Sequence, residues 1–437
     1  MRQIYNLHLF KIFPILFVSL IAYYLFEFYL IENNANLHFW CININNNFNL
    51  GSLKAVSLPI HCDEGPYRLA SQSIEQFFSK NNPYQSRPLY VFLIYFISNL
   101  IDSLLFFDLS EYQNFRLSMI ILQTVIMTAI ISLFVSLLKL EFNSYRDFFI
   151  IILLIGIPGV RWNLFFPSAG NITLLLFLII LKLVVENKTL VKNKKSIYLF
   201  LSFLSLAHLT SIIYGFIYEL INILRFKKTY FLSRIFNIGL LLIFPVLYRL
   251  MVYFLGYDFY DWHTGVYGQF SWIIYEIQDR TFFNFQTLGK HLATYLKITL
   301  NYLGYFLILL AYFFTLVILV KNKQKVIPIT VKYAFLINSI IFIFWGLQGI
   351  YESFRFTNYS IGYFLFISIF IFLVESFNKN LYLISALFFY TLSIGYAEPY
   401  NEALNYPNLN YFTYLSVGFF IVFIFKEIRL KKEKIKL

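Results

Sequence analysis

Two adjacent carboxylates, Asp63 and Glu64, are the residues whose position in the chain best suits chemistry. They precede Pro66, which fits the first position of a helix because an N–H there has no helical partner. Apolar side chains then recur at helical spacing as far as Phe78, with polar side chains on the opposite face. The pattern predicts an amphipathic helix on a membrane surface, with both acids at the end where the helix dipole favours negative charge. A carboxylate held there can take a proton from an attacking hydroxyl group, although the same acids also suit a simple helix cap.

The composition predicts an all-α integral membrane protein. Aromatic residues make up 22% of the chain and charged residues 13%, and apolar segments long enough to cross a bilayer recur from end to end. The 35 Lys and Arg residues exceed the 22 Asp and Glu residues, which gives a net charge of +13. These bases gather in short loops and at both termini, so the positive-inside rule accounts for them and no nucleic-acid partner is expected.

The charge pattern predicts about twelve transmembrane helices plus juxtamembrane helices on the outer side. Both termini are basic and are expected in the cytoplasm, which requires an even number of crossings. We expect residues 88–107 to stay on the outer side as a re-entrant or juxtamembrane helix. Residues 197–224 have bases at both ends, so they are expected to form a hairpin of two short helices with an outer turn at Ala207–Ser211. The sequence leaves open whether 88–107 crosses the membrane.

Other ionisable residues of the predicted outer face are candidates for substrate binding. Arg355 in a short outer loop and Arg249 near the outer end of a span are candidates for binding a lipid phosphate, because a guanidinium makes paired contacts to phosphate oxygens. Both also suit interfacial anchors. The candidate substrate contacts are Arg68, Arg87, His208 and Glu352. Six scattered histidines form no metal-binding pattern, and no soluble-enzyme motif occurs.

Both cysteines, Cys41 and Cys62, lie in the predicted first outer loop, residues 32–116. A disulfide between them would tether the loop beside Asp63 in an oxidising compartment. The sequence leaves this pairing open.

The order of these features resembles the GT-C superfamily of polytopic glycosyltransferases, in particular the protein-mannosyltransferase and aminoarabinose-transferase type. The features that carry the resemblance are Asp63-Glu64, the helix Tyr67–Phe78, Pro88-Leu89-Tyr90, Arg116, the turn Ala207–Ser211, the bases Arg225–Lys228 and the long outer loop 257–296. The resemblance covers residues 1–300, which it implies form the catalytic transmembrane module. Residues 301–437 are then expected to add C-terminal transmembrane helices and a basic cytoplasmic tail.

The resemblance implies inverting transfer of a sugar from a polyprenyl-phosphate donor to a glycan, lipid or protein acceptor. The reaction would take place on the outer, periplasmic face of the bacterial inner membrane, among membrane lipids. Asp63 would act as general base with support from Glu64, while Arg355 and Arg249 would stabilise the departing phosphate. Many relatives carry an acid in the second outer loop, yet residues 161–171 contain none. A second catalytic acid is therefore unidentified, and no metal ligands are assigned, although a divalent metal is left open as a cofactor.

Two alternatives remain at this stage. A polysaccharide polymerase or ligase acting on lipid-linked glycans would depend on the loop 257–296 rather than on Asp63. A lipid or sugar transporter or flippase would place more charged groups near the middle of the membrane and show two related halves, and neither feature is evident.

Overall fold

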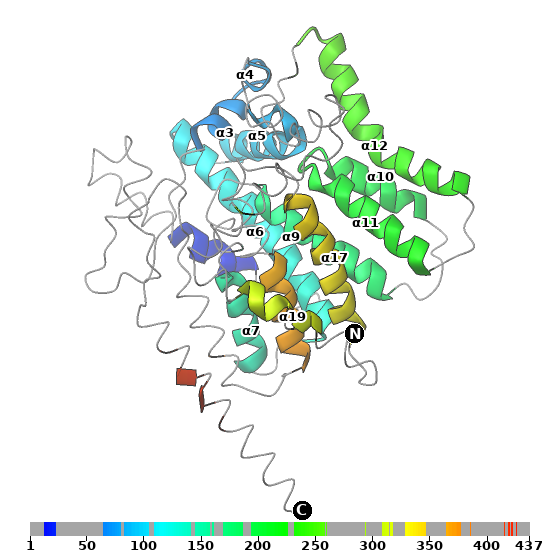
Figure 1. Ribbon diagram of the computed structural model, residues 1–437. Coiled ribbons are helices and arrows are strands. Elements are labelled where there is room, and N and C mark those ends of the chain that lie inside the picture. Colours follow the sequence, from blue (N-terminus) through cyan, green and yellow to red (C-terminus); the bar gives the residue numbers. More distant parts are fainter. Residues whose placement is uncertain are drawn as a thin grey trace, which may run out of the picture. The chain divides into compact units, whose positions relative to one another are not determined.

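The structure is a computed structural model of the whole chain. The residues that it describes are 13–22, 64–79, 83–104, 109–140, 145–157, 160, 169–186, 194–225, 231–257, 259, 293, 308–313, 315–317, 328–346, 364–376, 385, 415, 418–419, 421–422 and 425. Every regular element in these segments is helical, as the composition predicts (Figure 1). The chain forms two compact units. The first contains residues 1–35, 61–137 and 163–275, and the second contains 36–60, 138–162 and 276–437.

The first unit holds the amphipathic segment and the helices that support it. Its labelled elements are α3 (Glu64–Ala70), α4 (Ile74–Phe77), η2 (Pro83–Ser86), α5 (Pro88–Leu104), α6 (Glu111–Leu138), α9 (Gly170–Glu186), α10 (Lys194–Leu204), α11 (Thr210–Arg225) and α12 (Phe231–Phe254). The helix α6 ends one residue beyond the unit.

The helices α10 and α11 form an antiparallel hairpin, which confirms the two short helices expected between 197 and 224. Near the connecting turn, the Ser211 hydroxyl donates to the Leu201 carbonyl at 2.6 Å. Farther from the turn, the Tyr198 hydroxyl donates to the Glu219 carboxylate across the same interface. The bases Lys195 and Arg225 therefore lie at the end of the hairpin opposite the turn.

The helix α12 runs parallel to α10. The ammonium group of Lys195 lies 4.9 Å from the centre of the Phe236 ring, and the backbone N–H of Phe244 donates to the Ser202 hydroxyl at 3.1 Å. The C-terminal end of α12 therefore lies at the same end as the α10–α11 turn. The helix bends along its length (Figure 1), as expected where Pro245 has no N–H to donate and its ring crowds the preceding turn.

The helices α6 and α9 run parallel to each other, toward the end with the bases. Asn171 at the start of α9 donates to Gln123 of α6 at 3.4 Å, and Lys182 donates to Ser136 at 2.7 Å. The Arg225 guanidinium donates to the Val184 carbonyl at 2.6 Å, so α9 and α11 end together. We call this end of the first unit the basic end and the opposite end, which holds the α10–α11 turn, the turn end.

The helix α5 lies beside the N-terminal half of α6 and does not reach the basic end. Its Tyr90 accepts a hydrogen bond from Gln123 at 3.0 Å, and its Asp102 accepts one from Asn114 at 2.5 Å. Both ends of α5 are therefore held between Asn114 and Gln123, in the turn-end half of the 28-residue α6. That 88–107 does not cross a membrane stays a prediction.

The second unit includes α7 (Tyr145–Gly156), α17 (Ile329–Gly346) and α19 (Phe366–Ser376). The helices α17 and α19 pack antiparallel around Asn338, whose amide donates to the Phe364 carbonyl at 2.9 Å and to the Ser368 hydroxyl at 2.8 Å. The hydroxyl of Tyr312 donates to the Phe335 carbonyl of α17 at 3.0 Å, and the two rings stack.

The described helices do not support twelve transmembrane crossings. Two of them, Gln113–Leu138 and Ser233–Phe254, are long and apolar enough to span a bilayer by length and composition. Among the described residues, other expected spans contain shorter apolar helices, such as Phe13–Ala22 and Ile329–Phe344, whereas about 20 residues are needed to cross the hydrocarbon core. Charged residues mark where each apolar segment begins and ends, but they do not determine how many residues of the segment are helical.

Candidate functional site

The amphipathic segment is two short helices rather than the single helix expected through Phe78. The helix α3 ends at Ala70, and the Ser71 hydroxyl donates to the Arg68 carbonyl at 2.9 Å. Ser73 then caps α4 by accepting the backbone N–H of Gln76 at 3.1 Å. Serine side chains at these positions compete with the helical hydrogen bonds and favour a new helix start. Helical periodicity alone does not reveal this break.

The apolar face expected for this segment is mostly buried. Tyr67 and Ala70 of α3 are 1% and 2% exposed, and Phe77 of α4 is also buried. Ile74 belongs to the same expected face but is exposed, because the break before α4 changes the direction of the chain.

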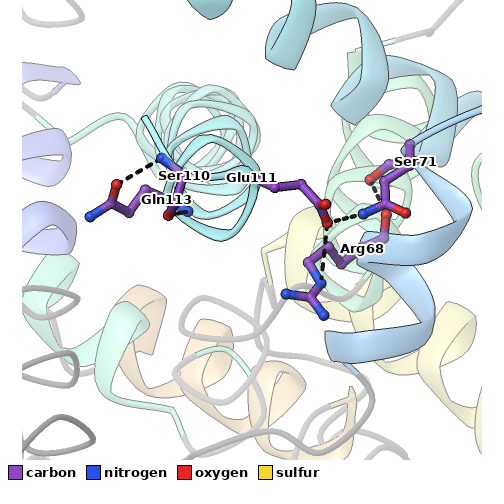
Figure 2. Close-up of polar contacts among 6 residues, drawn as sticks. Arg68, Ser71, Ser110, Glu111 and Gln113 are labelled. Carbon is purple, nitrogen blue, oxygen red and sulfur yellow. Dashed lines mark hydrogen bonds and ion pairs between the residues drawn. The ribbon is translucent and has the colours of Figure 1, made fainter. Parts of the chain in front are cut away.

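The polar side of α3 contacts the start of α6. Glu111 extends from the first turn of α6 to Arg68, whose Nε lies 3.7 Å from the carboxylate, as Figure 2 shows. The Gln72 amide also donates to Glu111. Gln113, two residues on, turns back to accept the backbone N–H of Ser110 at 3.0 Å (Figure 2). An exposed ion pair of this kind contributes little stability, about 0–1 kcal/mol, so Glu111 orients α3 more than it stabilises it.

The buried side of α3 contacts η2 and α5 through Tyr67. The Arg87 guanidinium donates to the Tyr67 hydroxyl, and the Tyr67 ring meets the Tyr90 ring edge-on with centroids 5.7 Å apart. Tyr90 accepts the Gln123 amide of α6, which in turn accepts the Asn171 amide of α9. Four helices are thereby joined through side chains buried beneath α3.

His208 lies in the turn between α10 and α11, beside the start of α5. Its Nδ1 accepts the backbone N–H of Thr210 at 3.4 Å and contacts the Thr210 hydroxyl at 2.8 Å. In the same turn the Leu206 carbonyl accepts the backbone N–H of Leu89 at 3.0 Å. The turn therefore packs against the residue that follows Pro88, where the chain enters α5.

Arg249 lies on the part of α12 that reaches the amphipathic segment. The Tyr248 hydroxyl donates to the Gln85 carbonyl of η2 at 2.9 Å. Arg249 itself is exposed, and its guanidinium carbon lies 4.7 Å from the centre of the Phe259 ring. Among the described residues it forms no ion pair. Stacking on an aromatic ring fixes the plane of a guanidinium and leaves its edge available for a phosphate.

A Schellman turn at the end of α12 directs the chain back to α4. Gly256 has a φ of 75°, and its N–H donates to the Tyr253 carbonyl at 3.0 Å. The N–H of Tyr257 donates to the Val252 carbonyl at 3.1 Å, and the Tyr257 ring then stacks on Phe78 with centroids 4.5 Å apart. Arg68, Arg87, His208 and Arg249 are thus all at the turn end of the first unit, on elements that contact α3, η2 or the start of α5.

The remaining predicted site residues are not described. Asp63 directly precedes α3 but lies outside the described residues, as do Glu352, Arg355, Cys41, Cys62 and nearly all of the loop 257–296. Glu64 begins α3, but its side chain is not described. Among the described residues, no group of three or more His, Cys, Asp or Glu side chains is placed to hold a metal ion.

Sequence reasoning missed three buried polar residues inside apolar helices. Gln123, Asn171 and Glu219 are each no more than 5% exposed. Their signal in the sequence is a single amide or carboxylate within a long apolar run or, for Asn171, at the start of one. Such a group is costly to bury without a partner. That signal identifies a buried polar contact but not the partner that meets it.

The turn end of the first unit therefore holds three arginines, of which Arg68 pairs with Glu111 and Arg87 donates to Tyr67. The exposed guanidinium of Arg249, beside the Phe259 ring, can bind an anionic group. No family model matches the chain, and no curated protein or solved structure is significantly similar to it.

Proposed function

We propose that the chain is an integral membrane glycosyltransferase that transfers a sugar from a polyprenyl-phosphate donor to a hydroxyl acceptor. The observation that carries the proposal is the grouping of three arginines around the helix that follows Asp63. Arg68 lies on α3, Arg87 donates to Tyr67 of α3, and Arg249 follows Tyr248, which donates to Gln85 of η2. Three of the candidates read from the sequence are therefore at the same end of the first unit. A site for a phosphate-linked donor requires cations for the phosphate, and these arginines meet that requirement at the end of the unit where α3 begins after Asp63.

A membrane location is supported by the two long apolar helices and by the surface of α12. The side chains of Val246, Leu247 and Leu250 are exposed on that helix, as expected for a lipid-facing surface. The hairpin and α9 gather the bases at the end of the unit opposite α3. By the positive-inside rule, the basic end faces the cytoplasm and α3 faces the outer side.

In the proposed reaction, an acceptor hydroxyl attacks the anomeric carbon of the donor sugar. Its O–H proton passes to the Asp63 carboxylate, a new glycosidic C–O bond forms, and the bond between the sugar and the phosphate oxygen breaks. The phosphate leaves with that electron pair, and attack from the opposite face inverts the anomeric carbon. Arg249 and Arg355 stabilise the negative charge that develops on the phosphate, and Glu64 supports the base.

The first experiment is mass spectrometry of the lipids that copurify with the full-length protein in detergent. We expect a polyprenyl-phosphate sugar, together with polyprenyl phosphate released by turnover. In the Asp63→Asn variant the sugar-linked form should be retained and the released form reduced at least about 100-fold, because the general base is lost. Glu75→Gln is the matched control, since Glu75 is an exposed acid at the start of α4, in the same segment.

Two results would overturn this proposal. One is release of polyprenyl phosphate by Asp63→Asn at the wild-type level. The other is copurification of a polyprenyl-diphosphate oligosaccharide, which is the substrate expected of a polymerase or ligase. Wild-type behaviour of Glu75→Gln is required before a loss in Asp63→Asn is assigned to the missing base.

A further inference from the structure

We infer that the buried side chains Tyr90, Gln123 and Asn171 form a positioning network that holds α3, the helix that directly follows Asp63, against the helix bundle. All three side chains are 0% exposed. The inference rests on the proposed function for the role of Asp63, but the contact of the network with α3 stands on geometry alone.

The hydrogen bonds of the network run in one direction. The Asn171 amide donates to the Gln123 carbonyl oxygen at 3.4 Å, and the Gln123 amide donates to the Tyr90 hydroxyl at 3.0 Å. Both ends of the Gln123 amide are therefore used, which sets the distances from α6 to α9 on one side and to α5 on the other. Buried polar contacts of this kind specify one arrangement of helices more narrowly than apolar contacts do.

Two contacts join the network to α3 at Tyr67. The Tyr90 ring meets the Tyr67 ring edge-on, and Arg87, three residues before Tyr90, donates to the Tyr67 hydroxyl. Tyr67 lies on the first turns of α3, four residues after Asp63. A shift of the Tyr90 ring therefore displaces the part of α3 nearest to the proposed base.

The unsatisfied side-chain oxygen of Asn171 indicates that this residue is present for its hydrogen bond and not only for packing. Its Oδ1 is buried without a hydrogen-bond partner among the described residues. An unpaired buried acceptor destabilises the folded protein, whereas an apolar side chain of similar size would avoid that cost. The buried Oδ1 of Asn171 is therefore a cost to stability, and the contribution of the side chain is the hydrogen bond that its amide donates to Gln123.

A general base acts only within hydrogen-bond reach of its proton, so its position controls the rate more than the affinity. A misplacement of about 1 Å can reduce the rate about 100-fold. The donor phosphate is bound in the proposed site by Arg355 and by Arg249, whose guanidinium lies against Phe259 rather than against a network side chain. Loosening the network should therefore lower kcat and leave the KM for the donor nearly unchanged.

The test uses Tyr90→Phe, which keeps the ring contact and removes the hydroxyl, and Gln123→Leu, which removes both amide bonds. The matched control is Tyr312→Phe in the second unit, which removes another buried, hydrogen-bonded tyrosine hydroxyl, one that donates to the Phe335 carbonyl. The probe is the sugar-linked lipid extracted from wild-type protein and returned in mixed micelles. Hydrogen exchange of residues 64–70 is followed on the same full-length samples.

We expect Tyr90→Phe to lower kcat about tenfold with KM within about twofold of wild type, and to speed amide exchange in 64–70. Gln123→Leu should have larger effects of the same kind, and Tyr312→Phe should have neither. Wild-type kcat in Tyr90→Phe, or an equal loss of kcat in Tyr312→Phe, would overturn the inference. If Asp63→Asn is inactive while both network variants are fully active, the inference fails and the proposed function stands. If the wild-type protein has no turnover, the proposed function fails. If amide exchange in residues 64–70 is then also unchanged in Tyr90→Phe and Gln123→Leu, the inference fails as well.

Discussion

Replacing Gly215 by alanine should destabilise the packing of α11 against α12. A Cβ atom at this position would lie 2.4 Å from Cδ2, 2.7 Å from Cδ1 and 3.1 Å from Cγ of Leu241. Carbon atoms pack at about 3.5–4.0 Å, so the Leu241 side chain must move by about 1 Å or more. Leu241 is fully buried, which leaves it little room to do so.

The magnitude follows from two opposing terms. Overpacking of a buried site costs about 1–3 kcal/mol, while exchanging glycine for alanine in a helix interior contributes about 1 kcal/mol of stability. The net effect of Gly215→Ala should therefore range from near zero to a loss of about 2 kcal/mol. Gly239→Ala is the matched control on α12, because Gly239 is exposed and a Cβ there meets nothing within 4 Å. That variant should gain stability from the propensity term alone.

The assay is the thermal midpoint of the full-length protein in detergent, followed by intrinsic tryptophan fluorescence at one scan rate. Adding Leu241→Ala to Gly215→Ala should cost less than Leu241→Ala costs in wild type, because the new methyl group occupies part of the space that leucine leaves. A Gly215→Ala midpoint equal to or above that of Gly239→Ala would refute the close approach of the two helices. Strict additivity of the two substitutions would refute it equally.

Two further predictions concern the ends of helices in the first unit. Gly256→Ala should lower the thermal midpoint by the equivalent of about 1–2 kcal/mol, because alanine is strained at a φ of 75°, and Gly256→Asn should recover part of the loss. A midpoint unchanged by alanine would contradict the Schellman turn. Glu111→Gln should change the midpoint by less than about 1 kcal/mol equivalent, with a difference from wild type that shrinks in high salt, because the Arg68–Glu111 pair is exposed. A large and salt-independent loss would show that Glu111 has a buried role that its exposure does not suggest.

The sequence predicts the helices of the first unit well where charge marks both ends of an apolar segment. Bases before residue 197 and after residue 224 predict a hairpin with its turn at Ala207–Ser211, and the structure has α10 and α11 joined there. The burial of Tyr67 and Ala70 follows from helical spacing in the same way. Both signals are local, so they can be read without knowing what the segment packs against.

Signals that depend on partners far away in the chain could not be read from the sequence. Gln123 and Asn171 are 48 residues apart, and nothing in the spacing of either residue indicates that they meet. The break between α3 and α4 depends on which serine bonds to which backbone group, and several serines in this segment offer the same chemistry. A charge in an apolar span marks Arg249 as a candidate, but the contact of its guanidinium with the Phe259 ring depends on the turn at Gly256.

The helices α3 and α6 both begin at the turn end because α5, which lies between them in the chain, stays in that half of the first unit. The start of α5 is held by the Leu206 carbonyl in the α10–α11 turn, and the end of α5 is held by Asn114 in the second turn of α6. Both anchors lie in the half of the unit opposite the bases, so α5 brings the chain back to the end from which it came. Glu111 can therefore begin α6 beside Arg68 of α3, although the two residues are 43 positions apart in the chain. If α5 extended to the basic end, α6 would begin there and Glu111 would lie far from Arg68. The Arg68–Glu111 ion pair therefore depends on α5 staying within the turn-end half of the unit.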